Sequence, residues 1–397
     1  MRTAWVFSAL VCMRTVMAAT LIGPPAINPA GDPDSVEFIG PRVMSAFEIL
    51  DTQVPPGERM QLEWHANSSL AGSDLASPVL VVHGERPGPV LCLIAGMHGD
   101  ELNSVEIVRR VANTVDPLDF GGTLVAIPVV NLFGYLRNSR YLPDRRDLNR
   151  FFPGTPHGSI ASRIAYSLFN RVIRHCDAVV DLHTGSFSRR NLPQVRADLS
   201  RDEVGELARS FGATAVLHSR GARGMLRTAA SEAGIPTVTF EVGGPAELEP
   251  DEIAHGEQAL QTVLHKLGMT RHSPTWDESQ PVFYESSWIR SDVSGLLLSY
   301  VGLGEQVSAD QILGVVIDPI TNTERKLVSP AAGTIIGMAR NQVVLPGFAV
   351  FHLGGETSEQ HVVREARSGS PGVPDEDGQA LDEAHEARAL DEGLDGD

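Results

Sequence analysis

The stretch Ala178-Val179-Val180-Asp181-Leu182-His183-Thr184-Gly185 combines a short apolar strand with polar side chains at its end. The apolar residues at 178–180 are typical of a buried strand, and His183 lies at the carboxyl end of that strand. In open α/β sheets, ligand sites form beyond the carboxyl ends of the strands. This segment therefore predicts a central strand that carries an imidazole to the edge of a sheet.

Apolar runs and amphipathic segments alternate on both sides of this strand. We expect strands at 78–82, 90–95, 123–130, 178–182, 214–217 and 237–242, and helices at 101–113, 159–174, 202–211 and 251–267. Strands that alternate with helices indicate an α/β layer fold. The alternation therefore predicts an α/β domain built around a largely parallel sheet.

The sequence changes character after this domain. Residues 280–355 contain short apolar runs and glycine turns, which predict a small all-β, barrel-like domain. Residues 356–397 hold 13 Asp and Glu against three Arg and no aromatic residue, and we expect this acidic tail to be disordered.

The N-terminus resembles a secretory signal. Residues 1–19 place Arg2 before a short apolar run, with small residues after it, and residues 20–40 form a proline-containing extension. We favour export slightly over a cytoplasmic location, and both remain open because Arg14 interrupts the pattern. No apolar run approaches the roughly 20 residues that a membrane-spanning helix needs.

Charge and cysteine content restrict the function further. A net charge of −18 argues against nucleic acid or an anionic membrane surface as a partner, because phosphate recognition requires clustered cations. Three cysteines exclude a disulfide framework. We expect Cys92 and Cys176, which lie in apolar surroundings, to be reduced core residues.

Two histidines and a carboxylate form a candidate metal site. His98 follows an expected strand, and Glu101 stands three residues later in the first turn of a helix. Alone, this pair is more typical of an ordinary surface contact, and His183 alone is more typical of a hydrogen-bonded core residue. Because the two strands can share one sheet edge, the three residues together suit a catalytic zinc with an open coordination position. Asp181 could orient these ligands or simply cap the strand end.

A further carboxylate lies inside an apolar strand. Glu241 stands in Phe240-Glu241-Val242-Gly243-Gly244, where burial of a charge is costly without a task or a partner. A partly desolvated Glu is suited to remove a proton from water. The alternative is an edge-strand Glu that faces solvent, and the glycine pair disfavours it.

An arginine-rich stretch runs from Asn138 to Gly154. Arginine binds carboxylates in a bidentate fork and can stabilise an oxyanion, so Arg140 and Arg150 would fit a carboxylate-bearing acyl substrate. Composition alone would instead indicate a solvated basic patch.

These motifs, in this order, resemble the succinylglutamate desuccinylase/aspartoacylase family, which has a zinc carboxypeptidase-like (M14-type) fold. The resemblance implies a three-layer catalytic domain at residues 41–270, with a mostly parallel or mixed central sheet. The resemblance runs from about residue 41 to residue 267 and rests on five short motifs: His98-x-x-Glu101, Arg140-Tyr141, Asp147-Leu148-Asn149-Arg150-x-Phe152-Pro153-Gly154, Asp181-Leu182-His183 and Phe240-Glu241-x-Gly243.

The resemblance implies a deacylase that hydrolyses the amide of an N-acylated amino acid or a related small carboxylate. It implies one Zn²⁺ per subunit held by His98, Glu101 and His183. It further implies that Glu241 is the general base, that Arg140 polarises the carbonyl, and that Asn149 and Arg150 bind the substrate carboxylate. The small β domain resembles the family's C-terminal domain, for which we expect a lid or oligomer-contact role, and a homo-oligomer is compatible with it.

Several alternatives stay open. Arg189, Arg190 and Arg196 are candidates for a second substrate-binding arginine, and exposed loop arginines are an equally good interpretation. A zinc carboxypeptidase that trims peptides and a non-catalytic binding protein of the same fold are the alternative functions.

Overall fold

The computed structural model describes residues 45–66, 76–272, 274, 276 and 282–372. Its contacts divide the chain into Met1–Ser45 and Ala46–Asp397, and the elements below belong to the second unit. The predicted leader (1–19) and extension (20–40) lie outside the described residues, as do residues 373–397. Across the described ranges, no helix has both the length and the apolar character needed to cross a membrane.

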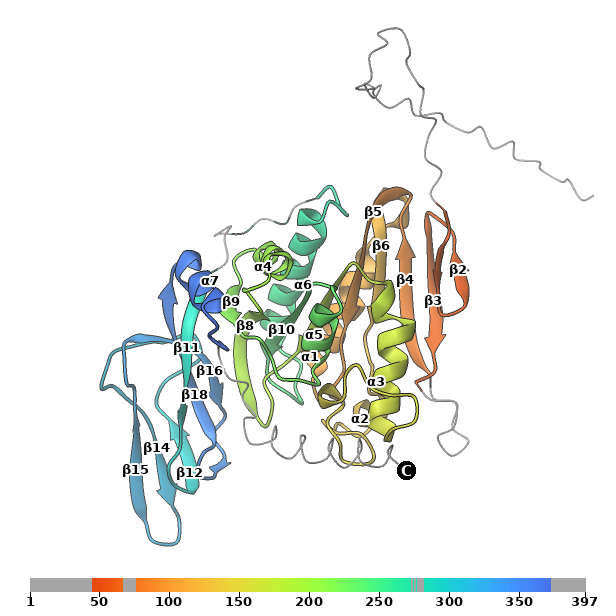
Figure 1. Cartoon of the computed structure of the whole chain (residues 1–397). Coiled ribbons are helices and arrows are strands. Elements are labelled where there is room, and N and C mark those ends of the chain that lie inside the picture. Colours follow the sequence, from red (N-terminus) through yellow and green to blue (C-terminus); the bar gives the residue numbers. More distant parts are fainter. Residues whose placement is uncertain (1–44, 67–75, 273, 275, 277–281, 373–397) are drawn as a thin grey trace, which may run out of the picture. The chain divides into compact units, whose positions relative to one another are not determined.

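A 12-stranded mixed sheet runs through the molecule (Figure 1). Its strands, in spatial order, are β13 (Gln306–Val307), β16 (Gly333–Ala339), β18 (Ala349–Thr357), β11 (Val282–Arg290), β9 (Ala215–His218), β8 (Arg189–Ala197), β10 (Thr237–Gly243), β7 (Ala178–His183), β5 (Arg86–Ile94), β6 (Gly121–Ile127), β4 (Ser77–His83) and β3 (Glu58–Trp64). The central strands β6, β5, β7 and β10 are parallel, whereas β8 pairs with β10 in the antiparallel direction. The α/β class and the mixed sheet are thus as predicted.

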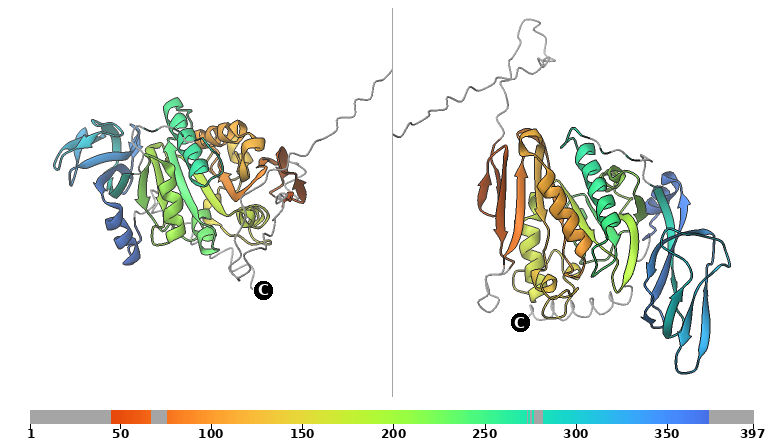
Figure 2. Two further views of the ribbon diagram at one scale, coloured as in Figure 1. Left: turned by 90° about the horizontal axis from the view of Figure 1, so that it is seen from above. Right: turned by 180° about the vertical axis from the view of Figure 1, so that it is seen from behind.

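Helices cover both faces of this sheet (Figure 2). One face carries α1 (Leu102–Thr114), α4 (Asp202–Ala208) and α6 (Pro250–Lys266), and the other carries α3 (Ile160–Arg171) and α5 (Leu226–Glu232). Strand β5 shows how the sequence feeds both cores: Leu91 and Leu93 pack in the first, and Cys92 and Ile94 in the second. Each such buried aliphatic side chain contributes about 1.5–3 kcal/mol. The result is three layers, with α2 (Leu132–Tyr135) in a loop beyond β6.

The C-terminal region is built from strands, as predicted. A four-stranded sheet holds β15 (Thr323–Val328), β14 (Ile312–Asp318), β12 (Gly295–Ser299) and β17 (Val343–Val344). Strands β11, β16 and β18 of the same region join the central sheet, because β11 pairs with β9 and β16 pairs with β8. A separate ribbon, β1 (Phe47–Ile49) with β2 (Thr52–Val54), lies at the N-terminal end.

The prediction of disorder from residue 356 onward is wrong for residues 356–372. Strand β18 continues to Thr357, and helix α7 (Glu359–Arg367) follows it. The Ser358 side chain caps this helix, and Val362 and Ala366 are buried in the core. Two apolar positions four residues apart thus suffice to fix a helix whose other side chains are mostly charged.

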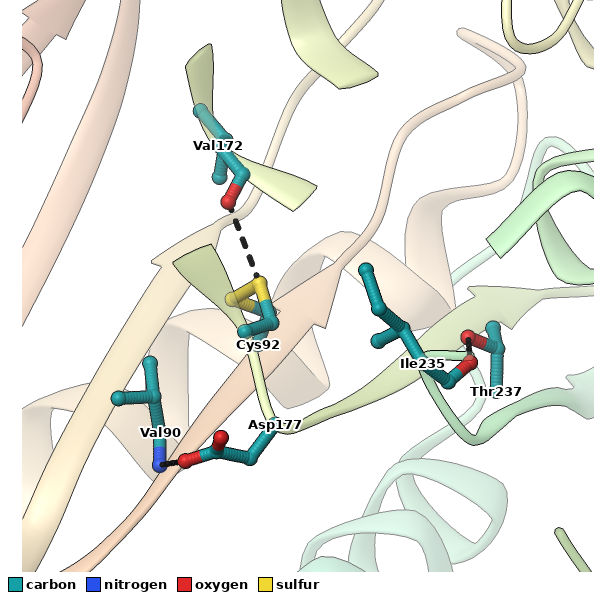
Figure 3. The surroundings of a disulfide bond; sticks show 7 residues. Val90, Cys92, Val172, Asp177, Ile235 and Thr237 are labelled. Atoms are coloured by element: carbon teal, nitrogen blue, oxygen red, sulfur yellow. Dashed lines mark hydrogen bonds between the residues drawn. A yellow bond between two sulfur atoms is a disulfide. The ribbon is translucent and has the colours of Figure 1, made fainter. Parts of the chain in front are cut away.

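The prediction of reduced core cysteines is also wrong. Cys92 on β5 and Cys176, which shortly precedes β7, form a disulfide with a Cα–Cα distance of 5.9 Å (Figure 3). Asp177 beside it accepts a hydrogen bond from the Val90 backbone at 2.7 Å. A separation of 84 residues hides this pair in the sequence, whereas parallel pairing of β5 with β7 brings the two cysteines together.

Replacing both Cys92 and Cys176 by alanine should lower the free energy of unfolding by about 2–4 kcal/mol, because the crosslink closes a long loop in the unfolded chain. Urea denaturation with and without reductant measures the change. Reductant should shift the midpoint of the original protein and leave that of the double variant unchanged. An equal response of both proteins to reductant would contradict the crosslink.

Candidate active site

The three predicted metal-ligating residues converge at the carboxyl ends of two parallel strands. His98 lies in the loop after β5, Glu101 precedes α1, and His183 ends β7. The two glutamate oxygens each face one imidazole: His98 Nδ1 is 2.7 Å from Oε1, and His183 Nδ1 is 2.9 Å from Oε2. All three residues are buried, and they form a group whose donor atoms could hold one metal ion.

The second ring nitrogen, Nε2, of each histidine contacts a further carboxylate. His98 Nε2 lies 3.0 Å from Asp147 Oδ1, and His183 Nε2 lies 3.0 Å from Asp181 Oδ2. Such partners fix the orientation of a ligating imidazole and increase its basicity. Asp181 thus has the geometry for the orienting role considered from the sequence. Asp147 is a second residue of this kind that the sequence reasoning missed, although it stands in the motif that begins at Asp147-Leu148-Asn149.

The donor set fits a zinc ion. The Nδ1 atoms of His98 and His183 are 3.3 Å apart. Two nitrogens at the usual 2.0–2.1 Å from a tetrahedral zinc would be separated by about 3.3 Å. Two imidazoles and one carboxylate are also the ligand types that catalytic zinc sites use.

Burial and the attraction between opposite charges shift the pKa values of Glu101, His98 and His183 in opposite directions. Burial alone would raise the pKa of Glu101, but the two adjacent imidazoles hold that pKa well below its usual range. Burial opposes protonation of His183, yet the carboxylates of Asp181 and Glu101 raise its pKa well above the ordinary value. The pKa of His98 is likewise raised, since Glu101 and Asp147 outweigh burial and the nearby Arg140. The cluster therefore keeps its glutamate ionised, as a cation site requires.

Glu241 lies beside the three candidate metal ligands. Strand β10 runs parallel to β7, and Glu241 is the register partner of His183. The residue is 8% exposed and lines the same cavity as the three donor residues. Its Oε1 is 3.9 Å from Nε of Arg196 on the antiparallel strand β8. This is a central strand, so the alternative of a solvent-facing edge-strand glutamate does not hold.

Arg140 points into the cluster. Its Nη1 donates to Glu101 Oε1 at 3.2 Å, and its Nη2 donates to Asp147 Oδ2 at 2.9 Å. The side chain is 9% exposed and lines the cavity. Its guanidinium is therefore a buried cation that contacts His98, Glu101 and Asp147. It is not part of a solvated basic patch.

Asn149 and Arg150 reach the cavity from a short 3-10 helix, Leu148–Arg150, that Asp147 caps through the Asn149 backbone. The Asn149 amide nitrogen lies 3.4 Å from His183 Nε2, and its Oδ1 accepts from the Leu226 backbone at 2.8 Å. Arg150 is 4% exposed and lines the cavity. The sequence-predicted substrate-binding residues therefore lie together with the metal-ligand cluster.

The cavity has further lining residues that carry no motif: Thr184, Ser186, Arg196, Met225, Arg227 and Thr239. Of the three open arginine candidates, only Arg196 is among them. Arg189 instead donates to the Ala349 backbone at 2.9 Å, and Arg190 pairs with Glu249. Arg227, on α5, was missed because the short helix Leu226–Glu232 has little amphipathic signal in the sequence.

The fold and this site place the chain among α/β proteins with a candidate metal centre at the strand ends. Residues 87–267, which are 181 of the 397 residues, match the model of the succinylglutamate desuccinylase/aspartoacylase catalytic domain, so the resemblance expected from the sequence motifs is confirmed. The names of the family and of its members denote enzymes that remove acyl groups from amide nitrogens, which supports a hydrolase activity.

Individual relatives show the same similarity. The chain is 27% identical over 266 residues to the N-alpha-acetyl-L-2,4-diaminobutyric acid deacetylase of Halomonas elongata. The aligned region covers 64% of this chain and 77% of that protein. A succinylglutamate desuccinylase/aspartoacylase structure from Rhodobacter sphaeroides superposes with a TM-score of 0.70 at 22% identity, covering 80% of this chain and all of that one. The product-bound ectoine utilization protein EutE (DoeB) of Ruegeria pomeroyi superposes with a TM-score of 0.68 at 24% identity, covering 76% of this chain and 97% of that one. These two structures support the fold.

Proposed function

We propose that this protein is a zinc-dependent hydrolase that cleaves the amide bond of a small, anionic N-acylated amino acid. One observation carries the proposal: the donors of His98, Glu101 and His183 converge in a cavity that Glu241 and four buried arginines also line. The four arginines are Arg140, Arg150, Arg196 and Arg227.

The three donor residues would hold one zinc ion per chain. Two imidazole nitrogens and a carboxylate suit zinc, and three protein ligands leave a coordination position open. When bound, the ion would supply Lewis-acid chemistry, polarising the amide carbonyl and acidifying water. Asp147 and Asp181 would keep both imidazoles in the ligating orientation through the 3.0 Å contacts described above.

Glu241 would move the proton in this reaction. Its carboxylate would accept a proton from the attacking water, whose oxygen forms the new bond to the acyl carbon. The same proton would then pass to the amide nitrogen as the carbon–nitrogen bond breaks, giving a free carboxylate and an amine. The position of Glu241 opposite His183 in the register of β10 and β7 supports this assignment.

The arginines would select and orient the substrate. Arg140 is placed beside Glu101, so its guanidinium can stabilise the oxygen that becomes negative during attack. Asn149 and Arg150 would bind the amino-acid carboxylate, since a guanidinium offers a carboxylate a bidentate fork. The remaining pair, Arg196 and Arg227, adds positive charge to the cavity and supports an anionic substrate.

We also infer that residues 41–270 form a zinc carboxypeptidase-like catalytic domain and that residues 280–355 form its small β domain. The helices on both faces of the sheet and the metal cluster at the strand ends support the first inference. The strands β12, β14, β15 and β17, with their own apolar core, support the second.

Metal analysis combined with a substrate panel tests the function. The panel contains N-acetyl and N-succinyl derivatives of acidic, neutral and basic amino acids, including N-acetyl-2,4-diaminobutyrate, together with C-terminal peptides. We expect about one zinc per chain, loss of hydrolysis after chelation, and recovery with added zinc. N-acyl amino acids with a free carboxylate should be hydrolysed faster than the same compounds with that carboxylate converted to an amide.

Two outcomes would overturn the proposal. Hydrolysis of peptides without deacylation would indicate a carboxypeptidase instead. A chain that binds no metal and hydrolyses no member of the panel would indicate a binding protein of the same fold.

A further inference from the structure

A second cavity, of about 520 Å³, adjoins the candidate active site. Its walls come from the end of β8 and from the loop and helix that follow β9; the lining residues are Asp198, Ser200, Arg201, Arg220, Gly221, Arg223, Arg227, Thr228, Ser231 and Glu232. Arg227 lines both cavities, and its guanidinium donates to the Ser219 backbone carbonyl. A ligand in the second cavity would therefore meet an arginine of the first.

The second cavity is cationic. It is lined by four arginines against two carboxylates, Asp198 and Glu232. Arg201 is committed in part to Asp198, at 3.4 Å, and to the Ser231 backbone, at 3.0 Å. Arg220, whose Nη2 donates to the Ala366 carbonyl at 3.2 Å, and Arg223 both lie exposed on the loop after β9. Arginine is the side chain best suited to bind carboxylates, so this surface fits an acidic ligand.

The last described residues of the chain are fixed beside this cavity. The Pro371 carbonyl accepts a hydrogen bond from the Arg220 backbone at 3.1 Å, and Gly372 forms a β-bridge with Ser219. Gly372 has a φ of 76°, and a Cβ there would lie 2.2 Å from the His218 carbonyl oxygen. Only glycine fits this approach. The chain therefore leaves the described structure at the cationic loop itself.

The segment that follows is strongly acidic. Residues 373–397 hold ten Asp and Glu against one basic residue, Arg388. The first three carboxylates are Asp375, Glu376 and Asp377. Three residues span at most about 11 Å, so the chain after Gly372 is long enough for the first carboxylate to reach the loop that carries Arg220. A tethered segment of this kind acts at an effective concentration of about the millimolar range.

We propose that residues 373–397 dock on the second cavity through the carboxylates at 375–377, with Arg220 and Arg223 as their main partners. Occupation of this cavity brings negative charge next to Arg227, so the docked segment competes electrostatically with anionic ligands of the active site. The docking follows from charge and attachment alone, and its effect on catalysis rests on the proposed function.

A binding experiment tests the docking without any enzymatic readout. A fluorescent peptide of residues 373–397 is titrated into a chain truncated after Gly372 at low and at high salt. We expect saturable binding that weakens at least about tenfold between 50 and 300 mM salt, because exposed ion pairs are screened. The full-length chain should bind the peptide more weakly than the truncated one, because its own segment occupies the cavity.

Matched variants identify the surface. The truncated chain with Arg220→Gln and Arg223→Gln should lose the peptide affinity by about tenfold or more, whereas Arg174→Gln, an exposed arginine on another element, should leave it unchanged. A peptide with Asp375→Asn, Glu376→Gln and Asp377→Asn should bind the truncated chain as weakly as the unchanged peptide binds the arginine double variant. Equal binding to both protein variants, or no binding at all, would overturn the proposal. One further result would overturn it. If the full-length chain binds inorganic phosphate in this cavity as tightly as the truncated chain does, a free anion and not residues 373–397 occupies the cavity.

The catalytic consequence has its own readout. With a substrate from the panel, truncation after Gly372 should lower KM about threefold to tenfold at low salt and leave kcat unchanged. The difference should vanish at high salt. If no panel substrate is hydrolysed, the proposed function fails while the peptide titration still decides the docking.

Discussion

Replacing His183 by alanine should abolish stoichiometric zinc binding and lower deacylation more than about a hundredfold. Removing a residue that hydrogen-bonds a metal ligand typically costs about 10–100-fold in metal affinity or activity, and removing the ligand itself should cost more. The Nδ1 atom of His183 is one of three donors, 2.9 Å from Glu101, and in the described part of the chain no imidazole besides those of His98 and His183 joins this group. Metal analysis after dialysis, paired with turnover of a panel substrate, measures both effects.

Two further variants make this result specific. Asp181→Asn should weaken zinc binding by about 10–100-fold, since it removes the carboxylate behind His183 but leaves the donor. His65→Ala, at a half-exposed histidine on the surface, should leave metal content and turnover unchanged. A His183→Ala protein that is folded by circular dichroism and still carries one zinc per chain would remove His183 from the ligand set.

The convergence of His98, Glu101 and His183 could be predicted because periodicity and topology act together there. Short apolar runs that end in polar residues identify β5 and β7, and parallel strands place their carboxyl ends at one edge. His98 and His183 therefore had to lie near each other once the two strands were adjacent. The same logic places Glu241, whose strand β10 pairs with β7.

Other features depend on contacts that local sequence does not encode. Strand β8 (Arg189–Ala197) is polar and contains a proline, so its pattern does not indicate a strand between β10 and β9. The partnership of Cys92 with Cys176 requires knowledge of strand order. The contact from Asp147 to His98 spans 49 residues and is set by the path of a loop. Helix α7 was obscured by its charge, because only Val362 and Ala366 of this helix are fully buried.

Glu241→Gln should retain zinc and lose turnover by about 10²–10⁴-fold, the usual contribution of a general base. The substitution keeps the shape of the side chain and its place on β10, but an amide cannot take the proton from water. The metal donors lie on other elements, so their geometry is untouched. Zinc content, KM and kcat measured on one preparation separate the two effects: kcat should fall while zinc content stays near one per chain.

Glu241→Asp provides the matched control, since it keeps the carboxylate and withdraws it by one methylene. Its turnover should lie between those of the original protein and Glu241→Gln, because position as well as charge governs proton transfer. The neighbouring Arg196, 3.9 Å away, stays in place in both variants, so a change in substrate binding would affect them alike. Near-normal kcat in Glu241→Gln would assign the proton transfer to another group, and the cluster of His98, Glu101 and His183 would then need a different base. A loss of turnover that follows a loss of zinc would instead show that Glu241 supports the metal site itself.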